Sequence, residues 1–254
     1  MGTQVLERRF AAIGARVKVV RGFSTRIDVR RDRRGEFFEI GLADRGIAVD
    51  VVEADRDERC LLLNVREDGA KSKFLCGMDE RHWFVAAIPE SERGVVGVAS
   101  AKDALQPQEV REAVARLRPR DRFRRRNVAY VRQGEWFFLP QWGLEVDEAD
   151  VLRDEPLTRG RGKDHVLQFA YRIGGETVFA NADHPQGITV EEFDRLSPAE
   201  RRRGWRELVR DPELYAKGAV RHPDHNTIVL HDWHRVLMNT EQRARAMRHV
   251  AFLD

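Results

Sequence analysis

The chain has 254 residues, which is enough for one large domain or two smaller ones with a hydrophobic core. Charged residues make up 34% of it, yet 45 basic residues against 42 acidic ones leave a formal charge of only +3. A mean hydropathy of -0.55 and the lack of a bilayer-length apolar run argue against an integral membrane protein. The first residues also lack the basic start and apolar stretch of a signal peptide, so we expect a cytoplasmic protein.

Arginine dominates the basic residues, with 39 arginines against six lysines. The planar guanidinium group grips phosphate better than an ammonium group does, so this excess favours a nucleic-acid partner. Codon drift in a GC-rich genome would produce the same excess throughout the chain. Most of these arginines are scattered and offset by nearby acids. Only a local cluster of arginines therefore supports nucleic-acid binding.

The N-terminal part predicts a helix followed by a β meander. The helix is expected over residues 4–13, with Gly14 as its C-terminal stop. Short segments rich in β-branched and aromatic residues then predict seven antiparallel strands. These strands are expected at 17–20, 26–30, 36–40, 47–52, 60–65, 73–76 and 83–88. Seven strands can form a strongly bent sheet or a barrel, and the pattern leaves both open.

The two cysteines lie in consecutive predicted strands joined by the dipeptide Asp68-Gly69. A two-residue turn at this dipeptide sets Cys76 opposite Leu61, and Cys60 opposite the residue after Cys76. In that register the thiols point to opposite faces of the sheet. We therefore expect no disulfide, and two free cysteines agree with a reducing compartment.

An arginine-rich segment at 116–126 follows two short predicted helices, the second starting near Pro107. Such a change of composition is typical of a junction between domains. We expect an N-terminal antiparallel β domain with flanking helices over residues 1–118. A second, smaller α+β domain is expected over residues 119–254.

The second half predicts further strands and two helices. Strands are expected at 128–132 and 135–139, and a hairpin at 166–173 and 176–180. A capping box at Ser197 and Glu200 predicts a helix that continues to about Val209. A final meander and a basic terminal helix from about Glu241 follow. The predicted class is α+β, with predominantly antiparallel meanders and a few short helices.

The segment 116–126 contains seven arginines and one aspartate, and aromatic residues follow it. A basic track beside aromatic rings is typical of proteins that bind single-stranded nucleic acid. The candidate contacts are Arg118, Arg120, Arg122, Arg124, Arg125, Arg126, Arg132 and Trp136. Two other interpretations stay open. The arginines can complete a helix and pair with the acidic stretch 145–150, and the aromatic residues can belong to the core.

The segment 221–239 contains four of the eight histidines, as two His-x-x-His pairs that each enclose an aspartate. A predicted strand between the pairs holds them roughly 20 Å apart, so the four cannot share one ion. One divalent metal at the first pair remains possible, with help from another loop. The candidate ligands are His184, His222, Asp224 and His225. His and Asp are also common in turns, where they bond to the local backbone.

These patterns support three functional hypotheses. The first is a non-catalytic nucleic-acid-associated protein that contacts phosphates and unpaired bases of single-stranded DNA or RNA. The second is a protein-interaction module that uses exposed sheet edges and a basic terminal segment. The third is a metal-dependent hydrolase or nuclease at the histidine-rich turn. No serine of the chain lies in a Gly-x-Ser-x-Gly motif, so nucleophilic serine catalysis is not expected.

Overall fold

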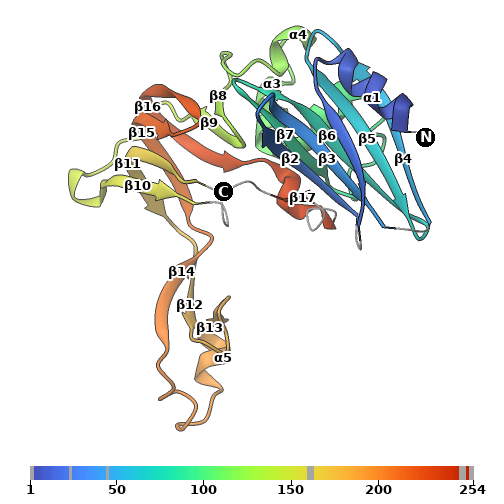
Figure 1. The fold of residues 1–254 in the computed structure, drawn as a ribbon. Helices are drawn as coiled ribbons and strands as arrows, with labels where there is room; N and C mark the ends of the chain where they lie inside the picture. Colours follow the sequence, from blue (N-terminus) through green and yellow to red (C-terminus); the bar gives the residue numbers. More distant parts are fainter. Residues whose placement is uncertain (1–2, 23–24, 44–45, 159–162, 246–249, 252–254) are drawn as a thin grey trace.

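The computed structural model describes residues 3–22, 25–43, 46–158, 163–245 and 250–251. These residues form four sheets, mostly antiparallel, with a few short helices, which confirms the predicted α+β class (Figure 1). Among the helices within these ranges, none is long and apolar enough to cross a membrane.

The N-terminal half contains helix α1 (Thr3–Ala12) and two four-stranded sheets. The first sheet has the order β1 (Val17–Arg21), β3 (Gly35–Leu42), β2 (Arg26–Asp32), β17 (Val250–Ala251). The second is a meander of β4 (Ile47–Asp55), β5 (Cys60–Glu67), β6 (Ala70–Asp79) and β7 (His82–Ile88). All seven predicted strands form at the expected positions. They divide between two sheets and do not close into a barrel.

The second sheet is buried on both faces. Leu61 and Leu63 pack with Phe38 of the first sheet and with α1, whereas Leu62 and Leu75 belong to the cluster on the opposite face. That face is covered by helix α2 (Val98–Leu105). Because alternate side chains of a strand point to opposite faces, a strand covered on both sides is apolar throughout. This explains the run Cys-Leu-Leu-Leu-Asn-Val at the start of β5.

The register between β5 and β6 is the one predicted from the Asp68-Gly69 turn. Leu61 pairs with Cys76, and Cys60 pairs with Gly77. The two cysteines lie in clusters on opposite faces of the sheet, and both are buried and free. The prediction that they form no disulfide is confirmed.

The C-terminal half is built on a six-stranded antiparallel sheet. Its order is β10 (Leu152–Leu157), β11 (His165–Ile173), β15 (Glu213–His222), β16 (His225–Met238), β9 (Trp136–Pro140), β8 (Val131–Gln133). A 3-10 turn, η1 (Glu148–Asp150), precedes β10. One end of this sheet carries the tight turns between β8 and β9 and between β15 and β16, and both face the N-terminal half.

A small three-stranded arm is inserted between β11 and β15. It contains β12 (Glu176–Ala180), β13 (Ile188–Thr189), β14 (Arg206–Arg210) and helix α5 (Val190–Asp194). Figure 1 shows this arm projecting away from the larger sheets. Its own aromatic contacts include Phe179 stacked on Phe193, with ring centroids 4.0 Å apart.

Helices and the C-terminal segment join the two halves. Val110 and Val114 of α3 (Gln108–Val114) pack with Tyr130 and with Phe137 of β9. The 3-10 turn η2 (Thr240–Arg243) donates a 2.7 Å hydrogen bond from Thr240 to the Ala104 carbonyl. The arginine-rich segment forms the short helix α4 (Pro119–Arg122) and the chain around it. The domain boundary at residues 118/119 stays a prediction.

The predicted hairpin around Gly174–Gly175 is wrong. Strand β11 pairs instead with β10 and β15, and β12 pairs with β13 and β14. Both glycines have positive φ, 68° and 90°, which redirects the chain from the large sheet into the arm. The strands were correctly located, but their partners lie far along the chain.

The helix predicted from Ser197 to Val209 is also wrong. The capping hydrogen bonds form, with the Ser197 hydroxyl donating to Glu200 at 2.6 Å, but only a turn follows. Gly204 adopts a φ of +67°, and residues 206–210 then pair with β12 as β14. The terminal helix expected from Glu241 is the single turn η2, and residues 246–249 of that prediction lie outside the described residues.

Candidate functional site

A cavity of about 830 Å³ lies between the two halves. Volumes of about 300–1,000 Å³ are typical of small-molecule sites. Its walls come from β5, β6, β7 and α2 on one side, and from the β8–β9 and β15–β16 turns on the other. Residues 123–125 of the arginine-rich segment complete the lining. The cavity therefore joins three regions that are distant in sequence.

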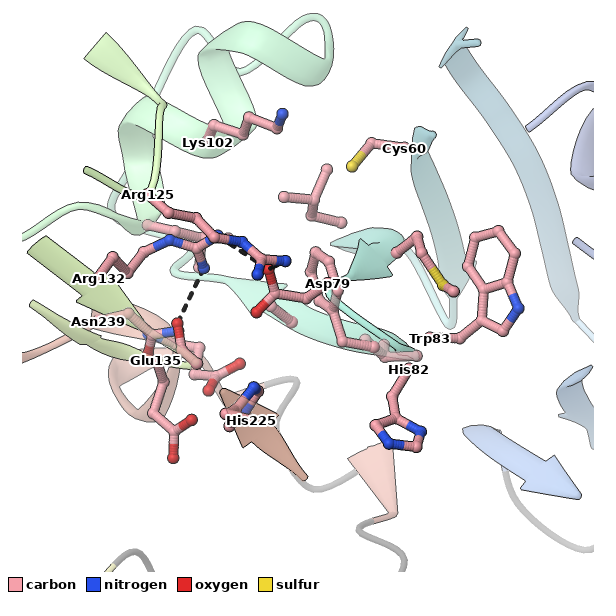
Figure 2. Close-up of a pocket in the computed structure, with 18 of the residues that line it drawn as sticks. Cys60, Asp79, His82, Trp83, Lys102, Arg125, Arg132, Glu135, His225 and Asn239 are labelled. Carbon is pink, nitrogen blue, oxygen red and sulfur yellow. Dashed lines mark hydrogen bonds and ion pairs between the residues drawn. The ribbon is translucent and has the colours of Figure 1, made fainter. Parts of the chain in front are cut away.

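Asp79 holds two arginines inside this pocket. Its carboxylate accepts hydrogen bonds from Arg125 at 2.5 Å and from Arg132 at 3.1 Å. Figure 2 shows both guanidinium groups reaching toward Asp79. Burial lowers the pKa of Arg125, while the charge of Asp79 opposes that effect. These two arginines are therefore part of an internal ion-pair network.

A clamp between two tight turns fixes the position of the pocket walls. The Glu80 carboxylate at the β6–β7 turn accepts from the backbone N–H of Asn226 at 2.9 Å and pairs with Arg125 at 2.7 Å. Arg81 donates to the Asn226 side chain at 2.7 Å. Glu80 has a φ of +48°, which is uncommon for a residue with a side chain. The clamp holds the β15–β16 turn against the N-terminal sheet.

Three histidines converge at the edge of the pocket. His222 ends β15 and His225 begins β16, and the two residues are paired across the turn between these strands. His165 begins β11, whose pairing with β15 brings it next to His222. One nitrogen of each imidazole lies within 4.8 Å of one nitrogen of each of the others. His222 and His225 line the pocket, while His165 is buried beneath them with 2% exposure.

Gly134, in the turn between β8 and β9, lies close against these rings. Gly134 has a φ of +56° and carries no side chain. A Cβ built at Gly134 would lie 3.0 Å from Nε2 of His225 and 3.6 Å from Nε2 of His165. Both Nε2 atoms therefore face the same small volume. The backbone can approach the rings this closely because the turn residue is glycine.

The hydrogen bonds of the cluster assign its protons. His222 Nε2 lies 3.2 Å from the Lys163 carbonyl, to which it donates, so Nδ1 carries the lone pair. Nδ1 of His222 accepts a 3.1 Å hydrogen bond from the Asp224 N–H. A metal ion bound to Nδ1 would take the place of this hydrogen bond. Nδ1 of His225 has no hydrogen-bond partner among the described residues, and Glu80 is 3.8 Å away.

Electrostatics favour the neutral, metal-binding form of His225. Burial lowers the pKa of His225, because the charged ring loses hydration, and the carboxylates of Asp79 and Glu135 act in the opposite direction. A proton on Nδ1, toward Glu80, leaves the lone pair on Nε2. Nε2 is the atom that faces Gly134.

The structure brings together two of the four predicted metal ligands. His184 lies in the arm, stacked on Trp205 with ring centroids 5.4 Å apart. Asp224 forms a 3.0 Å ion pair with Lys163 at the rim of the pocket. The third member of the cluster, His165, was missed. It stands just before a predicted strand, but only the pairing of β11 with β15 shows which residue it faces.

The predicted nucleic-acid residues fall into two groups. Arg118, Arg120, Arg124 and Arg126 are exposed. Arg122 donates to the carbonyls of Leu117 and Ala115, and Arg125 and Arg132 bind Asp79, so these three already have internal roles. Trp136 is 8% exposed and packs in the core of the six-stranded sheet. Its ring offers no free face to a base.

Comparisons with protein-family models, with curated proteins and with solved structures find no match to this chain.

Proposed function

We propose that this protein is a metal-dependent hydrolase whose ion is held by His165, His222 and His225. The observation that carries the proposal is the convergence of three imidazole nitrogens, within 4.8 Å of one another, beside a large pocket. Three histidines with water as a fourth ligand are a known catalytic zinc arrangement, whereas structural zinc sites use four protein ligands. Imidazole ligands also suit copper, iron and nickel.

Binding one ion requires the three histidine side chains to rearrange. Two nitrogens bound tetrahedrally at about 2.0–2.1 Å from zinc are roughly 3.3 Å apart. The nitrogens must therefore approach one another by up to about 1.5 Å, and the rings must also turn, because those of His165 and His222 are stacked with their centroids 4.2 Å apart. The fourth ligand position faces the pocket, because His222 and His225 line it and His165 closes the other side.

Neighbouring groups support the ligands as they do in known metal sites. A carboxylate or carbonyl oxygen commonly accepts the second N–H of a metal-bound histidine and fixes the ring. The Lys163 carbonyl takes this place for His222, and the Glu80 carboxylate lies 3.8 Å from Nδ1 of His225, on the side where it could do the same. Glu135 follows Gly134 and lines the pocket, so we assign it the role of general base. A bound ion would lower the pKa of its water and supply the nucleophile.

The first test is the metal content of the purified protein. We expect about one zinc per chain by inductively coupled plasma mass spectrometry after expression with added zinc, without a chelator. His222→Gln removes one ligand, and Gly134→Ala places a methyl group against His225 and His165, so both variants should lose the ion. Gly143→Ala is the matched control, because Gly143 also has positive φ but nothing lies within 4 Å of its Cβ.

Two results would contradict the proposal. One is a wild-type protein that neither retains zinc nor develops a ligand-field absorption spectrum when titrated with cobalt. The other is equal metal affinity in wild type and in His222→Gln, both shown to be folded by circular dichroism.

A second candidate function is nucleic-acid binding without catalysis. The observation that favours it is the exposure of Arg118, Arg120, Arg124 and Arg126. Trp136 has no role in this second candidate function, because its ring is buried. Salt-dependent binding of oligonucleotides by a protein that binds no metal would select this function.

A further inference from the structure

Four exposed arginines form a basic surface beside the pocket, which we call the arginine ridge. Its members are Arg118, Arg120, Arg124 and Arg126. Asp121 is the acidic residue within this segment, 3.3 Å from Arg124 and 3.9 Å from Arg120. One carboxylate against four guanidinium groups leaves the ridge strongly positive. The side chains of Arg120 and Arg124 are 70% and 64% exposed, so both remain accessible to a ligand.

The ridge reaches the pocket of the histidine cluster through one of its members. Arg124 lines that pocket, and so does the partly exposed ring of Phe123. His222 and His225 line the same pocket on the opposite side. A chain molecule bound along the ridge would therefore reach the proposed metal site without leaving the surface.

Within the pocket, by contrast, ion pairs balance the charges. Lys102 pairs with Glu58 at 2.6 Å, and Lys163 pairs with Asp224 at 3.0 Å. Arg125 and Arg132 share Asp79. These cations offer little net attraction to a small anion that fits inside the pocket. The unbalanced positive charge lies outside it, on the ridge, which suits a polyanion that extends beyond the pocket.

We infer that the substrate is a single-stranded nucleic acid, an inference that rests on the proposed hydrolase function. Its phosphates would follow the arginine ridge, and one phosphodiester would enter the pocket and face the three histidines. A flexible single strand can bend to place a phosphate in a concave site, whereas a duplex is stiff over this length. Phe123 offers a ring against which a base can stack at the mouth of the pocket.

The proposed reaction adds one water molecule across a phosphodiester bond. The oxygen of the activated water attacks phosphorus, and one ester P–O bond breaks. The bonding electrons leave with the ester oxygen, which becomes a hydroxyl group by taking up a proton. The attacking water loses that proton to Glu135, so the products are one phosphate monoester end and one hydroxyl end.

The experiment compares binding and cleavage of one fluorescently labelled oligonucleotide. Fluorescence anisotropy with oligo-dT and oligo-U is measured from 50 to 200 mM salt, and cleavage by zinc-loaded protein is followed on denaturing gels. The ridge variant is Arg124→Ala with Arg126→Ala. Its matched control is Arg8→Ala with Arg9→Ala, two exposed positions on α1 that remove the same charge. His222→Gln serves as the metal-site variant.

Single-strand binding weakens with a salt exponent of about 0.7 per phosphate contact, so four contacts predict a roughly 50-fold weaker affinity across this range. The ridge variant keeps two contacts, so its affinity should fall only about 7-fold across the same range of salt. The α1 control should behave as wild type. His222→Gln should keep the binding and lose the cleavage.

Several outcomes would overturn the inference. These are undetectable binding at 50 mM salt, equal salt dependence of the ridge variant and the control, or binding without cleavage by the zinc-loaded protein. Displacement of the oligonucleotide by an equal concentration of poly-glutamate would point instead to an acidic protein partner. If the protein binds zinc but fails these tests, the inference about the substrate is refuted and the proposed metal site stands. A protein that binds no metal refutes the proposed function as well.

Discussion

Replacing Asp79 by asparagine should destabilise the junction between the two halves. The substitution keeps the shape of the side chain but removes the charge that faces Arg125 and Arg132, 2.5 and 3.1 Å away. A hydrogen bond to a charged group contributes about 1.5–3 kcal/mol. Because the two arginines are 36% and 26% exposed, solvent screening reduces this, and we expect a loss of about 3 kcal/mol in total.

Urea denaturation measures this loss. For a chain of this size the dependence of the unfolding free energy on urea is about 3 kcal/mol/M, so the midpoint should fall by roughly 1 M. The control is Glu148→Gln, which breaks the exposed pair with Arg153 and should leave the midpoint unchanged. A shift of the same size in both variants, or no shift in Asp79→Asn, would refute the internal role of the Asp79 network.

Three further predictions follow from the core and from two titrating groups. Leu61→Ala should lower the free energy of unfolding by about 3 kcal/mol, because Leu61 is fully buried between the N-terminal sheets; calorimetry or urea unfolding checks this. Burial raises the pKa of the thiols of Cys60 and Cys76, so Ellman's reagent should titrate no thiol in the native protein at pH 8 and two in denaturant. A hydrogen bond from Arg16 holds the pKa of Asp32 well below its ordinary value, so this carboxylate stabilises the fold above about pH 4, and that contribution is lost as the pH falls. Acid unfolding of Asp32→Asn should accordingly depend less steeply on pH below 4 than that of wild type; an identical acid limb would contradict the Arg16 contact.

Local sequence patterns were sufficient to predict the strands of the N-terminal half. Its strands alternate or run apolar, and the turns between them contain Gly and Asp, so position, type and even the register around Asp68-Gly69 could be derived. What the pattern could not supply was the division into two sheets. That division depends on the parallel pairing of β1 with β3 and on the packing of Phe38 against Leu61 and Leu63, and these contacts link residues far apart in the chain.

The errors in the second half have the same origin. The glycines at 174 and 175 are typical of a hairpin turn, but the neighbouring edges of β11 are already taken by β10 and β15. The capping box at Ser197 is real, yet pairing with β12 decides the conformation of residues 206–210. Tertiary pairing overrode local propensity in both segments.

The candidate site could be predicted from the sequence only in part, because some of its contacts are local in the sequence and others are made by the fold. His222 and His225 are close in sequence across a two-residue turn, so their proximity could be predicted. His165 joins them only through the pairing of β11 with β15, and only the fold brings Gly134 of the β8–β9 turn against the rings. The exposed arginines were recognised by composition, but the engagement of Arg125 and Arg132 by Asp79 required the fold.

The most direct test of the central claim is an anomalous difference map from a crystal grown with zinc, recorded at the zinc absorption edge. The metal-site proposal predicts one strong peak above Gly134, within about 2.0–2.1 Å of one nitrogen each of His165, His222 and His225. The absence of a peak there, or a peak held by His184 or Asp224 away from this cluster, would contradict it.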